Sequence, residues 1–143
     1  MSEDDKVREG GCLCGAVRYR LTGKIRQVVN CHCGQCLKTH GHHAAYSAAL
    51  RDGLELIEDR GLIWYQSSEA ARRGFCGVCG SSLFWDAPRN AFVSVAAGTL
   101  DTPTRLRTLG NIFVSDKPDY YELDENLPAY PLSDGGVLNK LDP

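Results

Sequence analysis

Seven cysteines in three short clusters carry the chemistry that this sequence can do. Thiols separated by one or two residues can reach a single tetrahedral Zn²⁺ from one turn, with Zn–S bonds of about 2.3 Å. Glycines inside or directly after the clusters permit the tight turns that such knuckles require: Gly15, Gly34, Gly77 and Gly80. The spacing therefore predicts a metalloprotein. The clusters are Cys12-Leu-Cys14, Cys31-His-Cys33-Gly-Gln-Cys36 and Cys76-Gly-Val-Cys79.

A disulfide framework explains these cysteines less well than a metal does. Their number is odd, and they make up a smaller share of the chain than in disulfide scaffolds. The start, Met1-Ser-Glu-Asp-Asp-Lys, is acidic and has no apolar core, unlike a signal peptide or a mitochondrial presequence. We therefore expect reduced thiols and a cytoplasmic location.

Seven thiolates divide naturally into a set of four and a set of three. A four-cysteine zinc is closed and structural, whereas a three-cysteine zinc keeps one position for water or substrate. One partition joins the C-x-x-C pairs 33/36 and 76/79 into a zinc ribbon. The other joins 12/14 with 76/79 and leaves the triplet 31/33/36 intact. Spacing alone leaves both open, but we favour the second because a self-contained triplet needs no distant segment to face one metal.

The rest of the chain predicts an all-β domain made of short strands with little helix. The run 16–21 alternates apolar and polar residues, as a half-buried strand does. Similar runs, separated by turn residues, occupy 54–57, 62–66, 71–75, 82–85, 92–95 and 108–113. Only 39–49 and 101–105 suggest a helical turn. We expect one domain over residues 1–143, with irregular segments at 1–9 and 127–143.

Composition and charge exclude several classes of protein. Hydrophobic residues make up 43% of the 143 residues and charged residues 24%, which is the balance of an ordinary globular domain. No apolar run approaches the ~18 residues of a membrane-spanning helix. The formal charge of −2 is unevenly spread, because residues 115–143 hold seven acids and two bases. A mildly basic body with an acidic tail predicts neither nucleic-acid nor membrane binding, and suits a small anionic ligand.

Motifs along nearly the whole chain resemble the glutathione-dependent formaldehyde-activating enzyme family, which includes centromere protein V. The resemblance rests on Gly11–Tyr19, Cys31-His-Cys33-x-x-Cys36 and Phe75–Gly80, and on Ala97–Asp101, Asn111–Lys117 and Leu127-Pro128. It implies antiparallel sheets that lean together as a β-tent. It also implies two zinc ions per chain. Cys12, Cys14, Cys76 and Cys79 would hold a structural zinc, and Cys31, Cys33 and Cys36 a catalytic one.

A three-thiolate zinc favours thiol chemistry over water activation. Three anionic ligands reduce the Lewis acidity of the ion, so it activates water less than a three-histidine site does. A coordinated thiol, by contrast, is deprotonated outright. We therefore predict a zinc-dependent carbon–sulfur lyase that joins a glutathione-like thiol to a small aldehyde such as formaldehyde, as an S-(hydroxymethyl)glutathione synthase does. The alternative is a non-catalytic binding or scaffold protein stabilised by zinc.

Other side chains near the clusters have open roles. His32 lies between two predicted ligands and is expected to point away from the metal. His40, His42 and His43 follow closely enough to supply a fourth ligand or a proton relay, or to lie in a solvated loop. Lys38 and the Arg72-Arg73 pair offer positive charge to a carboxylate. Trp64, Tyr65, Phe84 and Trp85 are expected in the core or on a sheet face, with pocket lining as the less favoured alternative. Asp101 is expected to start a turn.

A methionine sulfoxide reductase, which is also a zinc-stabilised β protein, needs a free redox cysteine. All seven cysteines here are assigned to metal, so we set that function aside. The oligomeric state and the identity of the aldehyde and thiol stay open at this point.

Overall fold

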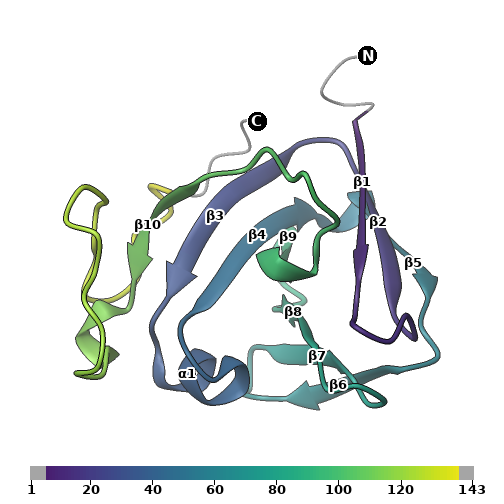
Figure 1. The fold of residues 1–143 in the computed structure, drawn as a ribbon, viewed down its shortest axis with the longest axis horizontal. Helices are drawn as coiled ribbons and strands as arrows, with labels where there is room; N and C mark the ends of the chain where they lie inside the picture. Colours follow the sequence, from purple (N-terminus) through teal and green to yellow (C-terminus); the bar gives the residue numbers. More distant parts are fainter. Residues whose placement is uncertain (1–5, 139–143) are drawn as a thin grey trace.

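Two β-sheets form the architecture in the computed structural model, which describes residues 6–138 (Figure 1). The strands are β1 (Val7–Gly11), β2 (Arg18–Thr22), β3 (Ile25–Cys31), β4 (Ala44–Leu50), β5 (Leu54–Glu58), β6 (Leu62–Gln66), β7 (Arg72–Cys76), β8 (Ser82–Asp86), β9 (Phe92–Ala96) and β10 (Thr108–Ile112). One α-helix, α1 (Gly34–His40), and three 3-10 turns, η2 (Arg51–Gly53), η3 (Ala97–Thr99) and η4 (Val114–Asp116), complete the elements in this part of the chain. The all-β prediction is confirmed.

The larger sheet has seven strands in the order β10-β3-β4-β9-β8-β7-β6, and the smaller sheet has the order β1-β2-β5. Figure 1 shows the small sheet standing at one end of the curved large sheet. Every strand pair is antiparallel except β10 with β3, which is parallel. The sheets are therefore antiparallel as expected, apart from this one pair at the edge. A parallel neighbour needs a long crossover, and here the whole chain from β4 to β9 forms it.

The main hydrophobic core lies between the two sheets. In β2 the side chains of Tyr19 and Leu21 are buried, while the arginines between and before them are more exposed. This alternation places one face of the strand inward. Tyr19 meets Phe84 of β8 edge to face, with ring centroids 5.3 Å apart. The core therefore joins the small sheet to the middle of the large one, as sheets that lean together require.

The helical expectations at 39–49 and 101–105 are wrong. The helix begins earlier, at Gly34, and ends where Gly41 adopts φ 78° as its C-cap. Residues 44–50 form strand β4 at the centre of the large sheet, between β3 and β9. Their alanines favour a helix in isolation, but burial between two neighbouring strands decides the outcome. Residues 101–105 form no regular element.

The two expected irregular tails differ from each other. β1 begins at Val7, so residues 7–9 belong to a strand and the expectation for them is wrong. Residues 127–138 contain no strand or helix, yet they are bonded to the end of the large sheet. Asn111 donates its N–H to Pro128 O, and Tyr130 donates its N–H to Asn111 O. The rest of both predicted tails, 1–5 and 139–143, lies outside the described residues.

Within residues 6–138, no helix has the length and apolar character needed to span a membrane.

Candidate metal centres

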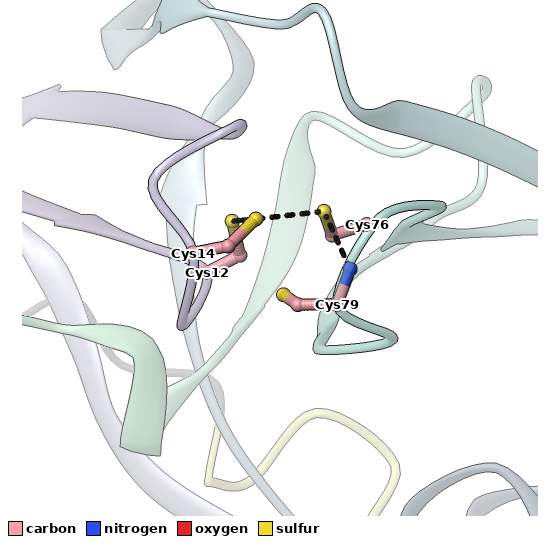
Figure 2. Close-up of side chains that lie close together, drawn as sticks. All are labelled: Cys12, Cys14, Cys76 and Cys79. Carbon is pink, nitrogen blue, oxygen red and sulfur yellow. Dashed lines mark hydrogen bonds between the residues drawn. The ribbon is translucent and has the colours of Figure 1, made fainter.

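Four cysteines from two distant turns meet at the junction of the two sheets (Figure 2). Cys12 and Cys14 lie in the turn after β1, and Cys76 and Cys79 lie at the end of β7 and in the turn that follows. Their four sulfur atoms all lie within 4.8 Å of one another. In Figure 2 the two turns face each other with these sulfurs between them. The arrangement can hold a metal ion.

The spacing of the sulfurs fits a tetrahedral zinc. Four sulfurs at about 2.3 Å from a common centre lie about 3.8 Å from each other. The Sγ atoms of Cys12 and Cys14 are 3.7 Å apart, and those of Cys14 and Cys76 are 3.8 Å apart. The donor set and its geometry therefore suit Zn²⁺.

Backbone N–H groups support the sulfurs of this four-cysteine cluster. Val17 donates its N–H to Cys12 Sγ at 3.2 Å, and Cys79 donates its N–H to Cys76 Sγ at 3.4 Å. Gly15 and Gly80, each directly after the last cysteine of its turn, have φ of 84°, which glycine adopts without strain. Gly34 and Gly77 need no such conformation. Hydrogen bonds from Ser81 lower the pKa of Cys79 to about 5, which favours the metal-binding thiolate.

The three remaining cysteines form a second cluster within one short segment. Cys31 ends β3, Cys33 is the N-cap of α1, and Cys36 lies in its first turn. The Sγ of Cys33 accepts a hydrogen bond from the N–H of Cys36 at 3.4 Å, as Cys76 does from Cys79. The three sulfurs lie within 4.8 Å of one another. This triplet can also hold a metal ion, with one position left for a further ligand.

The pKa values of the thiols in the triplet are shifted in opposite directions. Hydrogen bonds from Cys31 and Cys36 lower the pKa of Cys33 to about 2. The same contact with Cys33 raises the pKa of Cys31. The structure thus favours an anion at the centre of the triplet, the state in which cysteines bind metals.

The triplet lines a cavity of about 1000 Å³, which is large enough for a small-molecule ligand. Apolar side chains form part of its wall, among them Trp85 and Phe92. Trp85, for which a sheet face was expected and pocket lining was the less favoured alternative, packs against a buried cluster from β8 and also lines this cavity. Positive charge comes from Arg26 and Arg73, which are both largely buried, and from the exposed Arg89. Asp116 and Asp134 line the same cavity, so the positive charge that stands directly beside the cysteines is that of Arg73. This end of the cavity suits an anionic ligand whose reactive atom reaches the cysteines.

The two arginines proposed for anion binding point to opposite faces of β7, as neighbours in a strand must. Arg72 pairs with Asp86 at 3.0 Å and lies over the ring of Trp64, 3.8 Å from its centroid. Arg73 points to the triplet, with Nη2 3.7 Å from Cys36 Sγ. Lys38 is exposed on α1 and does not line the cavity. Asp101 forms an ion pair with Arg18 at 2.7 Å.

None of the four histidines joins either cysteine cluster in the described chain. His32 is buried, and its two ring nitrogens contact Asn111 Oδ1 at 2.8 Å and the Tyr121 hydroxyl at 2.7 Å. His40 contacts the hydroxyl of Tyr46 at 2.8 Å, and His42 contacts that of Tyr120. Burial and, to a smaller extent, the neighbouring histidines together lower the pKa of His43 to about 4. The histidines therefore make contacts with tyrosine and asparagine side chains and are not placed as metal ligands.

The structure groups the cysteines as in the second partition, with 12/14 beside 76/79 and the triplet apart. The residue that sequence reasoning did not single out is Tyr46, which lines the cavity and contacts both His40 and Arg73. Its position in β4 was hidden because 39–49 was expected to be helical.

Comparison with known proteins identifies the family. The family described as "Glutathione-dependent formaldehyde-activating enzyme" matches residues 7–116, a range that contains all seven cysteines. This chain belongs to that family. The resemblance drawn from the motifs is thereby confirmed.

Two curated relatives agree with this assignment, and one solved structure has a similar fold. A Halomonas elongata protein named "Putative glutathione-dependent formaldehyde-activating enzyme" is 28% identical, covering 81% of this chain and 80% of that protein. An "Uncharacterized lyase" of Schizosaccharomyces pombe is 26% identical, covering 80% of this chain and 83% of that protein. A crystal structure of a Rhodobacter sphaeroides protein has a TM-score of 0.55 at 22% identity, covering 68% of this chain and 91% of that chain. The last likeness concerns the fold.

Proposed function

We propose that this protein is a zinc-dependent carbon–sulfur lyase that joins a glutathione-like thiol to a small aldehyde such as formaldehyde. The observation that carries the proposal is the three-cysteine cluster in the wall of a large cavity. A purely structural zinc would need a fourth protein ligand and no cavity. Membership of the formaldehyde-activating family and the name of the Halomonas elongata relative support this reaction, and the name of the Schizosaccharomyces pombe relative supports a lyase.

Two zinc ions per chain fit the two clusters. Cys12, Cys14, Cys76 and Cys79 would hold a structural ion, and Cys31, Cys33 and Cys36 would hold the ion used in the reaction. When bound at the triplet, zinc would keep a coordinated thiol in its reactive thiolate form. The seven free cysteines also fit a reducing compartment such as the cytoplasm.

The reaction requires one new bond and one proton transfer. The thiol loses its proton, its sulfur attacks the carbonyl carbon, and an S–C bond forms. The C=O π electrons move to oxygen, which takes up a proton to give the S-hydroxymethyl product. In this chain, the cysteine triplet fixes the place of attack and the buried arginines supply positive charge for an anionic thiol. Trp85 and Phe92 add apolar surface to the wall of the same cavity.

The first experiment measures zinc per chain after purification without added metal or chelator, and then the exchange between glutathione, formaldehyde and S-hydroxymethylglutathione by NMR. We expect two zinc ions and exchange faster than in buffer. Cys33→Ser should return the exchange to the uncatalysed rate while the zinc of the four-cysteine cluster remains. Two bound zinc ions with neither thiol binding nor faster exchange would contradict the proposal and favour the scaffold alternative.

A further inference from the structure

Arg73 is a buried cation that lacks a carboxylate partner in the part of the chain that the structure describes. Only 7% of the residue is exposed. The ion pairs found among residues 6–138 include those of Arg18, Arg20, Arg51, Arg60 and Arg72, each with an acidic side chain, and none involves Arg73. Its charge must be compensated in another way, since an unpaired buried charge is strongly destabilising.

The guanidinium of Arg73 is held in place by neutral oxygens and by one sulfur. Nη1 donates to the hydroxyls of Tyr46 and Thr39, at 3.2 and 3.3 Å. Nη2 donates to Gln35 Oε1 at 3.4 Å and to Cys36 Sγ at 3.7 Å. The buried Nε–H has no hydrogen-bond partner. Apart from the cysteine, these partners carry no charge, so the triplet is the group that can balance the arginine.

We infer that Arg73 is the counterion of the three-cysteine site and makes that site accept an anionic thiolate as its fourth ligand. This inference rests on the proposed function. Three thiolates around Zn²⁺ carry one net negative charge, and the guanidinium brings the total to zero. An incoming thiolate therefore meets a neutral site. Without Arg73 it would meet a negative one, and like charges at such short range repel each other.

The four-cysteine cluster provides a contrast within the same molecule. No substrate has to join that cluster. The pKa of Arg60 is raised mainly by Glu58 and to a smaller extent by Cys14 and Cys12. Arg60 is exposed and paired with Glu58 at 2.6 Å. Among residues 6–138, the buried arginine without a carboxylate partner stands beside the cluster that has a position to fill. Arg73 is thus a positioning residue that acts through Cys36 and selects the charge of the ligand.

The test compares an anionic and a neutral ligand on the Co²⁺-substituted protein, whose visible spectrum changes when a fourth ligand binds. The anionic probe is 2-mercaptoethanol, which binds as its thiolate, and the neutral probe is imidazole. We expect Arg73→Gln to weaken the thiol by at least about tenfold and to leave imidazole within about twofold. Arg73→Lys, which keeps the charge, should restore most of the thiol affinity. Lys38→Gln is the matched control, because it removes an exposed positive charge of α1 that does not line the cavity.

The outcomes separate this inference from the proposed function. If the unaltered protein binds no thiol, the proposed function fails. If it binds thiol and Arg73→Gln binds it equally well, or if both probes weaken together, Arg73 is structural and the inference is overturned. Should the glutamine variant not fold, the lysine variant decides: equal losses of thiol and imidazole overturn the inference, and retained thiol affinity supports it.

Discussion

The same local hydrogen bond occurs in both cysteine clusters. In each C-x-x-C pair, the first sulfur accepts the N–H of the second cysteine, at 3.4 Å in both Cys33 and Cys76. Such bonds orient a thiolate before any metal arrives, which reduces the cost of assembling the site. Each of these bonds joins residues three positions apart. The spacing of the cysteines in the sequence is therefore enough to indicate where they form.

His43 should contribute to the pH dependence of the free energy of unfolding. Its folded-state pKa of about 4 lies below the ordinary value of 6.5, mainly because of burial. The unfolded chain therefore binds more protons between these values, so stability should fall as pH falls from about 6.5 toward 4. Denaturant unfolding between pH 7 and about 5.5, above the acid release of zinc, measures the slope. His43→Gln should make this slope shallower. An unchanged slope would show that His43 does not contribute to it.

Sequence reasoning grouped the cysteines as the structure does, because spacing places them, and it did not find the partners that only the fold brings together. The seven cysteines are recognisable because each knuckle is built from neighbours. Arg73 and Tyr46 are separated from Cys36 by strands that had to be placed first, and Tyr46 lies in a segment expected to be helical. Arg73 was considered only as one of a pair, because nothing in the sequence shows which of two adjacent arginines faces the cavity.

Some strands could be predicted from the sequence and others could not. Strands with clear alternation, such as β2, were predicted close to their observed bounds. β4 was missed because its AAYSAAL sequence is buried on nearly every residue, which removes the period of two that marks a half-exposed strand. β1 and β3 were not predicted either. β1 ends in two glycines, which disfavour a strand in isolation.

The packing of elements around the four-cysteine cluster can be tested at Gly61, just before β6. A Cβ added there would lie 2.7 Å from Ala16 Cβ and 3.0 Å from Cys76 Sγ. Gly61→Ala should therefore destabilise the protein by about 2 kcal/mol and speed the release of one zinc to a chromophoric chelator. Gly98→Ala is the matched control, because a Cβ there meets no atom within 4 Å. Equal behaviour of both variants would contradict this account.

The whole molecule is held together by one core and, in our proposal, by one structural zinc. The four-cysteine cluster joins the turn after β1 in the small sheet to the turn after β7 in the large sheet. Structural zinc contributes ~10–16 kcal/mol of apparent binding free energy in zinc-finger peptides. This is as large as the stability of a typical domain, so the two sheets should depend on the ion.

The proposed division of roles predicts opposite results for two cysteine variants. Cys79→Ser should lose the structural zinc and most of the cooperative thermal unfolding transition. Cys33→Ser should lose the other zinc and keep the fold, because a serine hydroxyl can still cap α1 in place of the sulfur. Calorimetry and zinc analysis of both variants provide the measurement. If Cys33→Ser unfolds and Cys79→Ser does not, the roles of the two clusters are reversed.

The different sequence separations within the clusters have a consequence for biogenesis. Cys31, Cys33 and Cys36 come from one segment, so a nascent chain can capture an ion there as soon as that segment emerges. Cys14 and Cys76, in contrast, are 62 positions apart, and closing so long a loop is slow compared with local contacts. The parallel pairing of β10 with β3, which brings Asn111 to His32 across 79 positions, comes later still in synthesis. Metal loading should therefore be ordered, with the reactive ion acquired before the one that joins the sheets.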